Sequence, residues 1–424
     1  MFLKAGLRFA VFCFVVGPGL GSGTLPNESI APDNGTVLVF FGVRHGNRNP
    51  EQFIPKTARN WGQEGTLELT SIGKRQGFGF GKELRKFVDK IVDRNFVTSE
   101  AKFFTSSANR CQMTLQAALA GLYPPTTYAV FDSQLDWTPV PYTINDPMLR
   151  MYAVSPCPNS DAAWKPISQD TLPHLANLTE ESKPLLDYMA QNTGWKPTIS
   201  NAADLADSLI NIALYNSTIP AWIQNPTLAN YTAASLHAAY LSFAENHQIA
   251  CAEYAPCRDM MAGVWVEHII ETLQQLKAGK TSLKLIGYAS HTEVTLSTMK
   301  ALHIVRHEIT TSAGFLIEVR RKAGKFQVRL LVHDPNPIDK HVIYQAEYSK
   351  ALRNWTKKGG VWVDVDDFIR LVKRKAIKNW EEACGIKNEC DDENFPSIRE
   401  RINKIRCLRA PWEDKTSDSD CEFS

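Results

Sequence analysis

Residues 36–50 read TVLVFFGVRHGNRNP, an apolar run that gives way to a charged segment. The part VLVFF has no polar residue, which is typical of a strand covered on both faces. Arg44, His45 and Arg48 follow it. Open α/β sheets bind ligands at the carboxyl ends of their strands. The stretch therefore predicts a buried strand that delivers a histidine and two arginines to a binding site.

The charged residues favour phosphate as the ligand. Arginine offers a planar fork of donors that fits a tetrahedral oxyanion. Two guanidinium groups also disfavour protonation of His45, so that a neutral imidazole nitrogen can attack phosphorus. The alternative is structural: Arg44 and Arg48 would form surface ion pairs, and His45 would bond a backbone carbonyl. The full pattern behind a buried strand favours the phosphate site.

The motif Arg44-His45-Gly46-x-Arg48-x-Pro50 resembles that of the histidine acid phosphatase family, a branch of the histidine phosphatase superfamily. The resemblance covers residues 36–335 and is strongest to secreted venom-like, lysosomal and prostatic-type acid phosphatases. It implies that His45 is the nucleophile and that Arg44 and Arg48 bind phosphate. Three further segments carry it: Leu69-Thr70 through Arg85, Ser106-Ser107 through Gln116, and Leu122-Tyr123-Pro124-Pro125.

The family's second motif is a histidine followed by aspartate at the end of a later strand, and here it is altered. The strand-like run 283–289 leads to Ser290, His291, Thr292 and Glu293. His291 is therefore expected to bind phosphate and take part in catalysis, but Thr292 cannot donate a proton near neutral pH. The arrangement His-x-Glu resembles the inositol polyphosphate phosphatase branch, which makes Glu293 the candidate proton donor. The alternative is that Glu293 only supports the start of a helix.

Thr105 is a second departure. The family places a third phosphate-binding arginine just before the Ser-Ser/Thr pair, where this chain has Thr105. Arg110 follows shortly after, but it resembles a structural arginine of the family better than the phosphate ligand. The loss of one arginine is expected to cost about 2–4 kcal/mol of charge stabilisation.

His333-Asp334 is the one His-Asp dipeptide in the sequence, and it is expected to be structural. It follows the strand-like run 326–332, but Pro335 and Pro337 come next. A helix cannot start there as the second motif requires. The sequence predicts a turn at the end of a strand.

The first 23 residues read as a secretory signal peptide. Lys4 and Arg8 precede the short apolar core Phe9–Val16, and small residues follow. The core is too short to span a bilayer, and no later stretch reaches about 18 apolar residues. We therefore expect a secreted or lysosomal-luminal protein without a membrane anchor.

Cysteines and sequons agree with that compartment. Eight of the 9 cysteines follow Cys13, and an even number in a secreted chain suggests four disulfides. The close pairs Cys251–Cys257 and Cys384–Cys390 would form local loops. The sequence contains no Cys-x-x-Cys motif, so it gives no support for a zinc site. Six Asn-x-Ser/Thr sequons are predicted to be exposed glycosylation sites: Asn27, Asn34, Asn177, Asn216, Asn230 and Asn354.

Charge excludes one class of partner. Of the 47 Lys and Arg residues, two lie in the signal peptide, and the remainder balance the 45 Asp and Glu residues. A nucleic-acid-binding protein would have a basic excess.

Alternating strands and helices predict an α/β fold: a mostly parallel central sheet with helices on both faces, as in histidine phosphatases, plus a helical cap insertion. The α/β core is assigned to residues 25–159 and 262–345, and the cap to 160–261. Residues 346–424 form a cysteine-containing C-terminal extension.

The sequence thus predicts a secreted acid phosphatase that hydrolyses phosphate monoesters through a phosphohistidine, with no metal or cofactor. One alternative is a weakened or inactive phosphatase-fold protein that binds a phosphorylated ligand. Another is an inositol polyphosphate or phytate phosphatase. A homodimer is suggested only by analogy with the family.

Overall fold

The structure, a computed structural model, describes residues 25–356 and 360–386. The predicted signal peptide and the cysteines Cys390, Cys407 and Cys421 lie outside the described residues. In the described ranges, no helix combines the length and the apolar character needed to cross a membrane.

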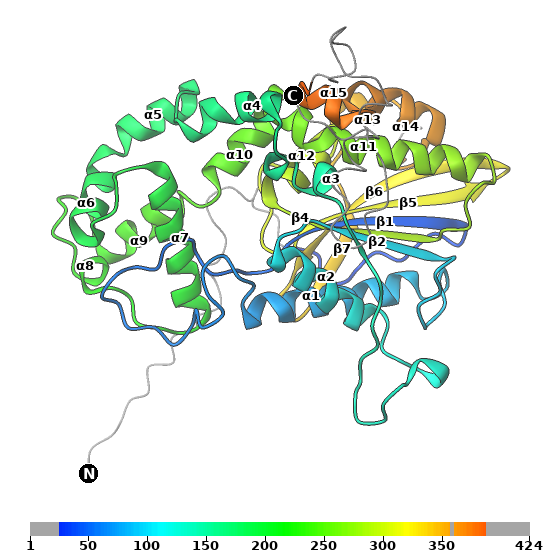
Figure 1. Cartoon of the computed structure of the whole chain (residues 1–424), viewed down its shortest axis with the longest axis horizontal. Helices are drawn as coiled ribbons and strands as arrows, with labels where there is room; N and C mark the ends of the chain where they lie inside the picture. Colours follow the sequence, from blue (N-terminus) through cyan, green and yellow to red (C-terminus); the bar gives the residue numbers. More distant parts are fainter. Residues whose placement is uncertain (1–24, 357–359, 387–424) are drawn as a thin grey trace, which may run out of the picture.

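A single mixed sheet forms the centre of the molecule (Figure 1). Its order is β3-β2-β4-β1-β5-β6-β7, with β8 paired to β6. The strands are β1 (Thr36–Arg44), β2 (Ala101–Thr105), β3 (Thr143–Ile144), β4 (Leu285–Ser290), β5 (Gly314–Lys322), β6 (Lys325–Pro335), β7 (His341–Gln345) and β8 (Val363–Asp364).

The α/β fold with a central sheet is confirmed, but the sheet is not mostly parallel. Strands β3, β2, β4 and β1 are parallel neighbours, whereas β5, β6 and β7 run antiparallel to their neighbours. For the β5–β6 pair the reason is the two-residue turn that joins them. Ala323 and Gly324 both have positive φ, as a tight hairpin turn requires. The predicted parallel arrangement of strands holds for the half of the sheet that contains the Arg-His-Gly motif.

Helices cover both faces of the sheet, which explains the unbroken apolar run of β1. Leu38 and Phe40 pack into one hydrophobic cluster, and Val39 and Phe41 pack into the cluster on the opposite face. Figure 1 shows α1 and α2 on one side of the sheet and α3, α11 and α12 on the other. These helices are α1 (Ser71–Val88), α2 (Asn109–Leu122), α3 (Asp146–Leu149), α11 (Ala255–Lys277) and α12 (Thr292–Ala301).

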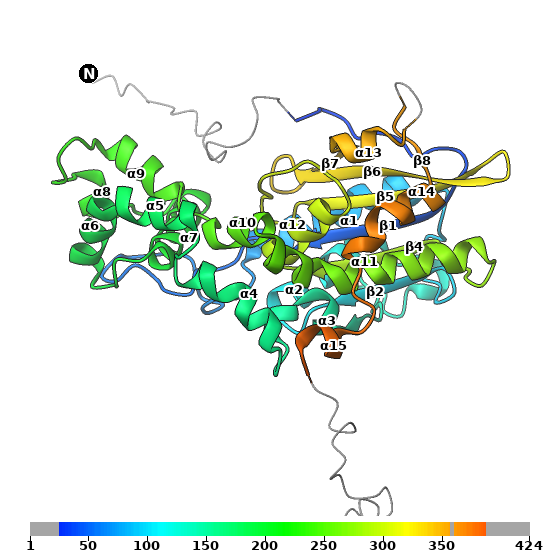
Figure 2. The same cartoon turned by 90° about the horizontal axis from the view of Figure 1, so that it is seen from above.

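Most of the inserted helices form a lobe beside the sheet, and the first and last of them pack on helices of the core (Figures 1 and 2). Helix α11 begins at Ala255, so the division at residue 261 falls inside one continuous helix. The inserted helices are α4 (Pro158–Ser168), α5 (Pro173–Glu181), α6 (Lys183–Thr193), α7 (Ile199–Leu214), α8 (Ala221–Gln224), α9 (Ala233–Leu241) and α10 (Asn246–Glu253).

The described residues beyond position 345 pack on the core. Strand β8 pairs with β6, and Phe368 is fully buried. The helices here are α13 (Lys350–Arg353), α14 (Val365–Val372) and α15 (Trp380–Cys384).

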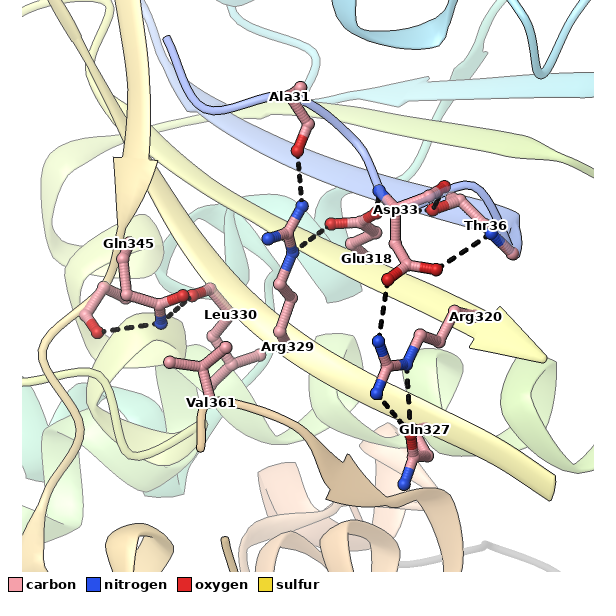
Figure 3. Close-up of polar contacts among 12 residues, drawn as sticks. Ala31, Asp33, Thr36, Glu318, Arg320, Gln327, Arg329, Leu330, Gln345 and Val361 are labelled. Carbon is pink, nitrogen blue, oxygen red and sulfur yellow. Dashed lines mark hydrogen bonds and ion pairs between the residues drawn. The ribbon is translucent and has the colours of Figure 1, made fainter. Parts of the chain in front are cut away.

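A buried polar network ties the segment before β1 to the antiparallel strands (Figure 3). The Arg329 guanidinium pairs with the Glu318 carboxylate, which is fully buried, and Nη2 of Arg329 donates to the Ala31 carbonyl at 2.7 Å. Arg320 pairs with Asp33 at 2.7 Å. Each buried charge thus has an opposite partner, as burial demands. The network fixes the start of β1, whose other end carries the motif.

Two disulfides are present among the described residues, and one corrects the predicted pairing. Cys251–Cys257 forms as predicted, but Cys384 pairs with Cys157 and not with Cys390. This bridge joins α15 to the start of α4. Cys111 is a free, fully buried thiol whose sulfur lies 3.3 Å from the Ser290 carbonyl oxygen. The expectation of four disulfides from eight cysteines is therefore wrong, because Cys111 is unpaired.

Candidate active site

Neighbouring parallel strands bring His45 and His291 together. In the register of β1 with β4, Arg44 lies opposite Ser290, so each histidine follows the end of its strand. The His45 backbone N–H donates to the Ser290 carbonyl at 2.9 Å. The two imidazole centroids are 5.7 Å apart, with an edge of one ring toward the other. Both side chains are buried at the edge of the sheet where α/β proteins bind ligands.

The hydrogen bond of His45 defines its tautomer. Its Nδ1 lies 2.9 Å from the Gly46 carbonyl oxygen, which can only accept. Nδ1 therefore carries the proton, and Nε2 keeps its lone pair. Burial, followed by the charges of Arg110 and Arg44, holds the pKa of His45 well below its usual value. His45 is thus held toward its neutral form, in which Nε2 is the nitrogen with a lone pair.

The glycine of the motif is required by a close backbone approach. A Cβ on Gly46 would lie 2.4 Å from the Gly73 carbonyl oxygen near the start of α1. The Gly46 N–H donates to Thr114 of α2 at 3.0 Å, and the Asn47 N–H donates to Gln76 of α1 at 2.7 Å. The loop that carries His45 is therefore fixed against two helices.

His291 is held from both sides by residues that follow β2. Arg110 Nη2 lies 3.1 Å from His291 Nδ1, and since arginine only donates, Nδ1 must accept. The proton then lies on Nε2, which donates to the Ser106 hydroxyl at 3.0 Å. Burial first, and then Arg110 and Arg150, lower the pKa of His291 well below its usual value. Arg110, which resembles a structural arginine of the family better than the phosphate ligand, therefore contacts a site histidine directly.

The cap supplies carboxylates to both motif arginines. Arg44 pairs with Glu245, which precedes α10, and its Nη1 donates to the Ile309 carbonyl at 2.7 Å. Arg48 pairs with Asp207 of α7 at 2.9 Å. These partners are buried or largely buried, so they are not the surface ion pairs of the structural alternative. The cap and the motif together therefore form one charged site.

Glu293 lies in the first turn of α12 and is 7% exposed. Burial raises its pKa, and the nearby Glu245 carboxylate raises it further. Arg110 and the Tyr152 hydroxyl act in the opposite direction. The Tyr152 ring in turn lies 5.6 Å from the His291 ring, centroid to centroid. Glu293 is therefore a carboxyl group at the site that keeps its proton to higher pH than an exposed glutamate.

Residues 39–311 match the Histidine phosphatase superfamily (branch 2). The chain belongs to this family. Its curated relatives include the lysosomal acid phosphatase of Homo sapiens, which is 23% identical over 358 residues. The alignment covers 82% of this chain and 80% of that protein. The prostatic acid phosphatase of Bos taurus is 20% identical over 370 residues, 85% of this chain and 89% of the relative.

Solved structures show the same fold. A phytase of Klebsiella sp ASR1 superimposes with a TM-score of 0.58 at 12% identity, over 81% of this chain and 96% of that one. A Hafnia alvei phytase in complex with myo-inositol hexakis sulphate gives a TM-score of 0.59 at 15% identity, over 83% and 99% of the two chains. At this identity the likeness concerns the fold alone.

The sequence analysis did not identify several residues of the site. Glu245 and Asp207 lie in the cap, far along the chain from the motif. Asp204 and Asp207 recur three residues apart on α7, which is the one pattern that could have indicated an acidic helix face. Arg150, whose Nη1 lies 3.3 Å from the Ser107 hydroxyl, carries no motif.

The His333-Asp334 dipeptide is structural, as predicted, although it lies within β6 and not in the turn after it. His333 stacks on Phe80 with the ring centroids 4.0 Å apart, and its Nε2 donates to the Gly42 carbonyl at 3.2 Å. Asp334 pairs with Arg306 at 2.6 Å. Neither side chain is part of the candidate active site around His45 and His291.

Proposed function

We propose that this protein is a secreted or lysosomal acid phosphatase that hydrolyses phosphate monoesters through a phosphohistidine on His45. The observation that carries the proposal is the state of His45: a buried imidazole held toward its neutral form, whose Nδ1–H is bound to Gly46 and whose ring lies beside His291. A nucleophile of this kind needs a fixed ring and a free lone pair.

In the first half-reaction, the Nε2 lone pair of His45 forms a P–N bond as the P–O bond to the leaving group breaks. Arg44, Arg48 and His291 bind the non-bridging oxygens. Glu293 transfers its proton to the leaving alkoxide. Its raised pKa suits this role, because a general acid must be protonated at the working pH.

In the second half-reaction, water attacks the phosphohistidine. The Glu293 carboxylate takes the proton of the water, the P–N bond breaks, and inorganic phosphate leaves. His45 then has its lone pair again, and Glu293 is again protonated. The arginines supply the charge stabilisation and His291 contributes a hydrogen bond, so the proposal includes no metal or cofactor.

The acidic residues of the cap favour activity at low pH. Burial raises the pKa of Asp204 to about 6 and also raises the pKa of Asp207, despite the nearby Arg48. Protonation of these groups weakens their attraction for Arg48. The guanidinium then becomes more available to the phosphate as the pH falls.

The test is hydrolysis of p-nitrophenyl phosphate by the glycosylated protein from pH 4 to 8, beside His45→Ala. The proposal predicts activity with an acidic optimum that the variant loses. Full activity in His45→Ala would overturn the mechanism.

A binding protein without turnover is the second candidate, and Thr105 and Thr292 favour it. Neither threonine can replace the charge or the acid that the family pattern places there. This candidate predicts saturable binding of inorganic phosphate with no hydrolysis above the His45→Ala level.

A phytate phosphatase is the third candidate, and the solved relatives suggest it. The cap of this chain disfavours it, because the Glu245 carboxylate, whose pKa is lowered by Arg44, presents negative charge to the site. A polyphosphorylated ring would be repelled there. Comparable kcat/KM for inositol hexakisphosphate and p-nitrophenyl phosphate would contradict this ranking.

Two features support the secretory compartment. The described part of the chain contains two disulfides, which persist in oxidising environments. All six sequon asparagines are exposed, as glycosylation requires. Enzymatic deglycosylation of the secreted protein, followed by mass spectrometry, tests their use.

We infer a homodimer from exposed apolar side chains on the loop that projects from the core in Figure 1. Tyr128, Phe131 and Trp137 are all exposed there. Such patches are typical of protein contacts. A monomer mass by light scattering, at micromolar concentration, would contradict the inference.

A further inference from the structure

The end of strand β2 brings no charge to the site. Thr105 is fully buried and lies opposite Ala289 in the register with β4, at the same edge of the sheet as the two histidines. Its hydroxyl donates to the Ser106 carbonyl at 3.3 Å. A substrate phosphate therefore meets no guanidinium from this strand.

Arg110 reaches the site from the next element. It is the second residue of α2, and its Nη2 approaches His291 Nδ1 at 3.1 Å. After burial, Arg110 is the charge that acts most strongly on both His45 and His291, ahead of Arg44 on each. The guanidinium thus contacts His291, whose ring centroid lies 5.7 Å from that of His45.

Arg110 also differs from the motif arginines in its partners. Arg44 and Arg48 are each paired with a cap carboxylate, whereas Arg110 has no carboxylate partner among the described residues. Its Nε is buried and has no hydrogen-bond partner there. A buried donor without an acceptor is costly unless a ligand supplies one.

We propose that Arg110 binds the substrate phosphate and takes the place of the arginine that is missing at Thr105. One Nη donates to His291, and the remaining N–H groups bind a non-bridging phosphate oxygen. The forked geometry of guanidinium allows both contacts at once. This inference rests on the proposed phosphatase function and extends it to a residue of α2.

The first test measures binding of inorganic phosphate at pH 5.5 by calorimetry in Arg110→Gln, Arg110→Lys and the wild type. We expect Arg110→Gln to bind phosphate about 10- to 100-fold more weakly, with partial retention in Arg110→Lys. Arg370→Ala removes an exposed guanidinium on α14 and is the matched control with unchanged affinity. Affinity of Arg110→Gln within twofold of the wild type overturns the proposal.

A double-mutant cycle separates direct contact from positioning of His291. If Arg110 touches phosphate, Arg110→Gln weakens binding in the His291→Asn background as well as in the wild type. If Arg110 acts only through His291, it has no further effect in that background, and the proposal fails. Thermal melts of each variant confirm folding.

The outcomes also distinguish this inference from the proposed function. A wild type that hydrolyses p-nitrophenyl phosphate while Arg110→Gln binds phosphate normally overturns the role of Arg110 alone. A wild type that binds phosphate through Arg110 without hydrolysis supports the inference and overturns turnover. A wild type that does not bind phosphate overturns both.

Discussion

The carboxylate of Glu245, from the cap, pairs with the guanidinium of Arg44 at the end of strand β1. Burial alone would raise the pKa of Glu245, but Arg44 and Arg48 lower it, so the pair is ionic. Glu245 has a left-handed backbone (φ 61°), which is uncommon for a residue with a side chain. A substrate phosphate must therefore compete with a carboxylate of the protein itself for Arg44.

Glu245→Gln should bind inorganic phosphate more tightly than the wild type, by about tenfold, because a neutral amide competes less for Arg44. Without phosphate the variant should melt at a lower temperature, since Arg44 is left buried and unpaired. The measurement is the melting temperature across a phosphate titration. The melting temperature of the variant should rise more with added phosphate than that of the wild type. Glu253→Gln on α10, which loses the pairs with Lys300 and His307 away from the site, is the control. A weaker phosphate affinity in Glu245→Gln would contradict the competition.

The loss of kcat in Glu293→Gln should depend strongly on the leaving group of the substrate. An alkyl phosphate needs a proton on its leaving oxygen, so its kcat should fall about 100- to 10,000-fold, whereas p-nitrophenyl phosphate should lose much less. In the wild type, activity should fall as the pH rises through the raised pKa of Glu293, and the variant should lose this limb. Glu271→Gln, an exposed change on α11, should behave as the wild type. Equal losses for both substrates would exclude Glu293 as the proton donor.

His333→Phe should make stability less sensitive to acid. Burial lowers the pKa of His333 to about 3, so between pH 6.5 and 3 only the unfolded chain binds this proton. Stability is therefore lost as the pH falls, by about 2 kcal/mol between pH 6.5 and 5. The variant should lose about 1 kcal/mol at pH 7 through the missing bond to Gly42, but show a smaller drop at pH 5. Urea unfolding at the two pH values measures this, with the exposed His307→Phe as control. If the free energy of unfolding fell as much with pH in the variant as in the wild type, His333 would not be the source of this pH dependence.

Removal of the Cys157–Cys384 bridge should cost about 3–5 kcal/mol, because it joins residues 227 positions apart. Removal of Cys251–Cys257, with a separation of 6, should cost about 2 kcal/mol. Both double alanine variants can be compared by urea unfolding. A non-reducing peptide map that links Cys384 to another cysteine would show that the long bridge does not form.

The parts of the site that follow strands could be predicted from the sequence. The apolar run of β1 fixed the place of His45, and the run before Ser290 did the same for His291, because parallel neighbours end at one edge. The direction of β5–β7 was not predicted, and the two-residue turn at Ala323 and Gly324 accounts only for the β5–β6 pair.

The charges that surround the histidines could not be predicted in the same way. Glu245 and Asp207 reach the motif only through the packing of the cap, about 200 residues along the chain for Glu245. Arg110 lies on a helix whose rotation decides whether its guanidinium points to the core or to the site. Sequence position alone does not determine that rotation.

The most direct test of the central claim is to trap the phosphoenzyme. The wild type is quenched in alkali during turnover of p-nitrophenyl phosphate, because a phosphohistidine is stable in base and labile in acid. Mass spectrometry of the peptides then locates the phosphoryl group. The account predicts it on His45, at a level that Glu293→Gln does not abolish and His45→Ala does. Turnover without a phosphoryl group on His45, and with activity retained in His45→Ala, would contradict the account.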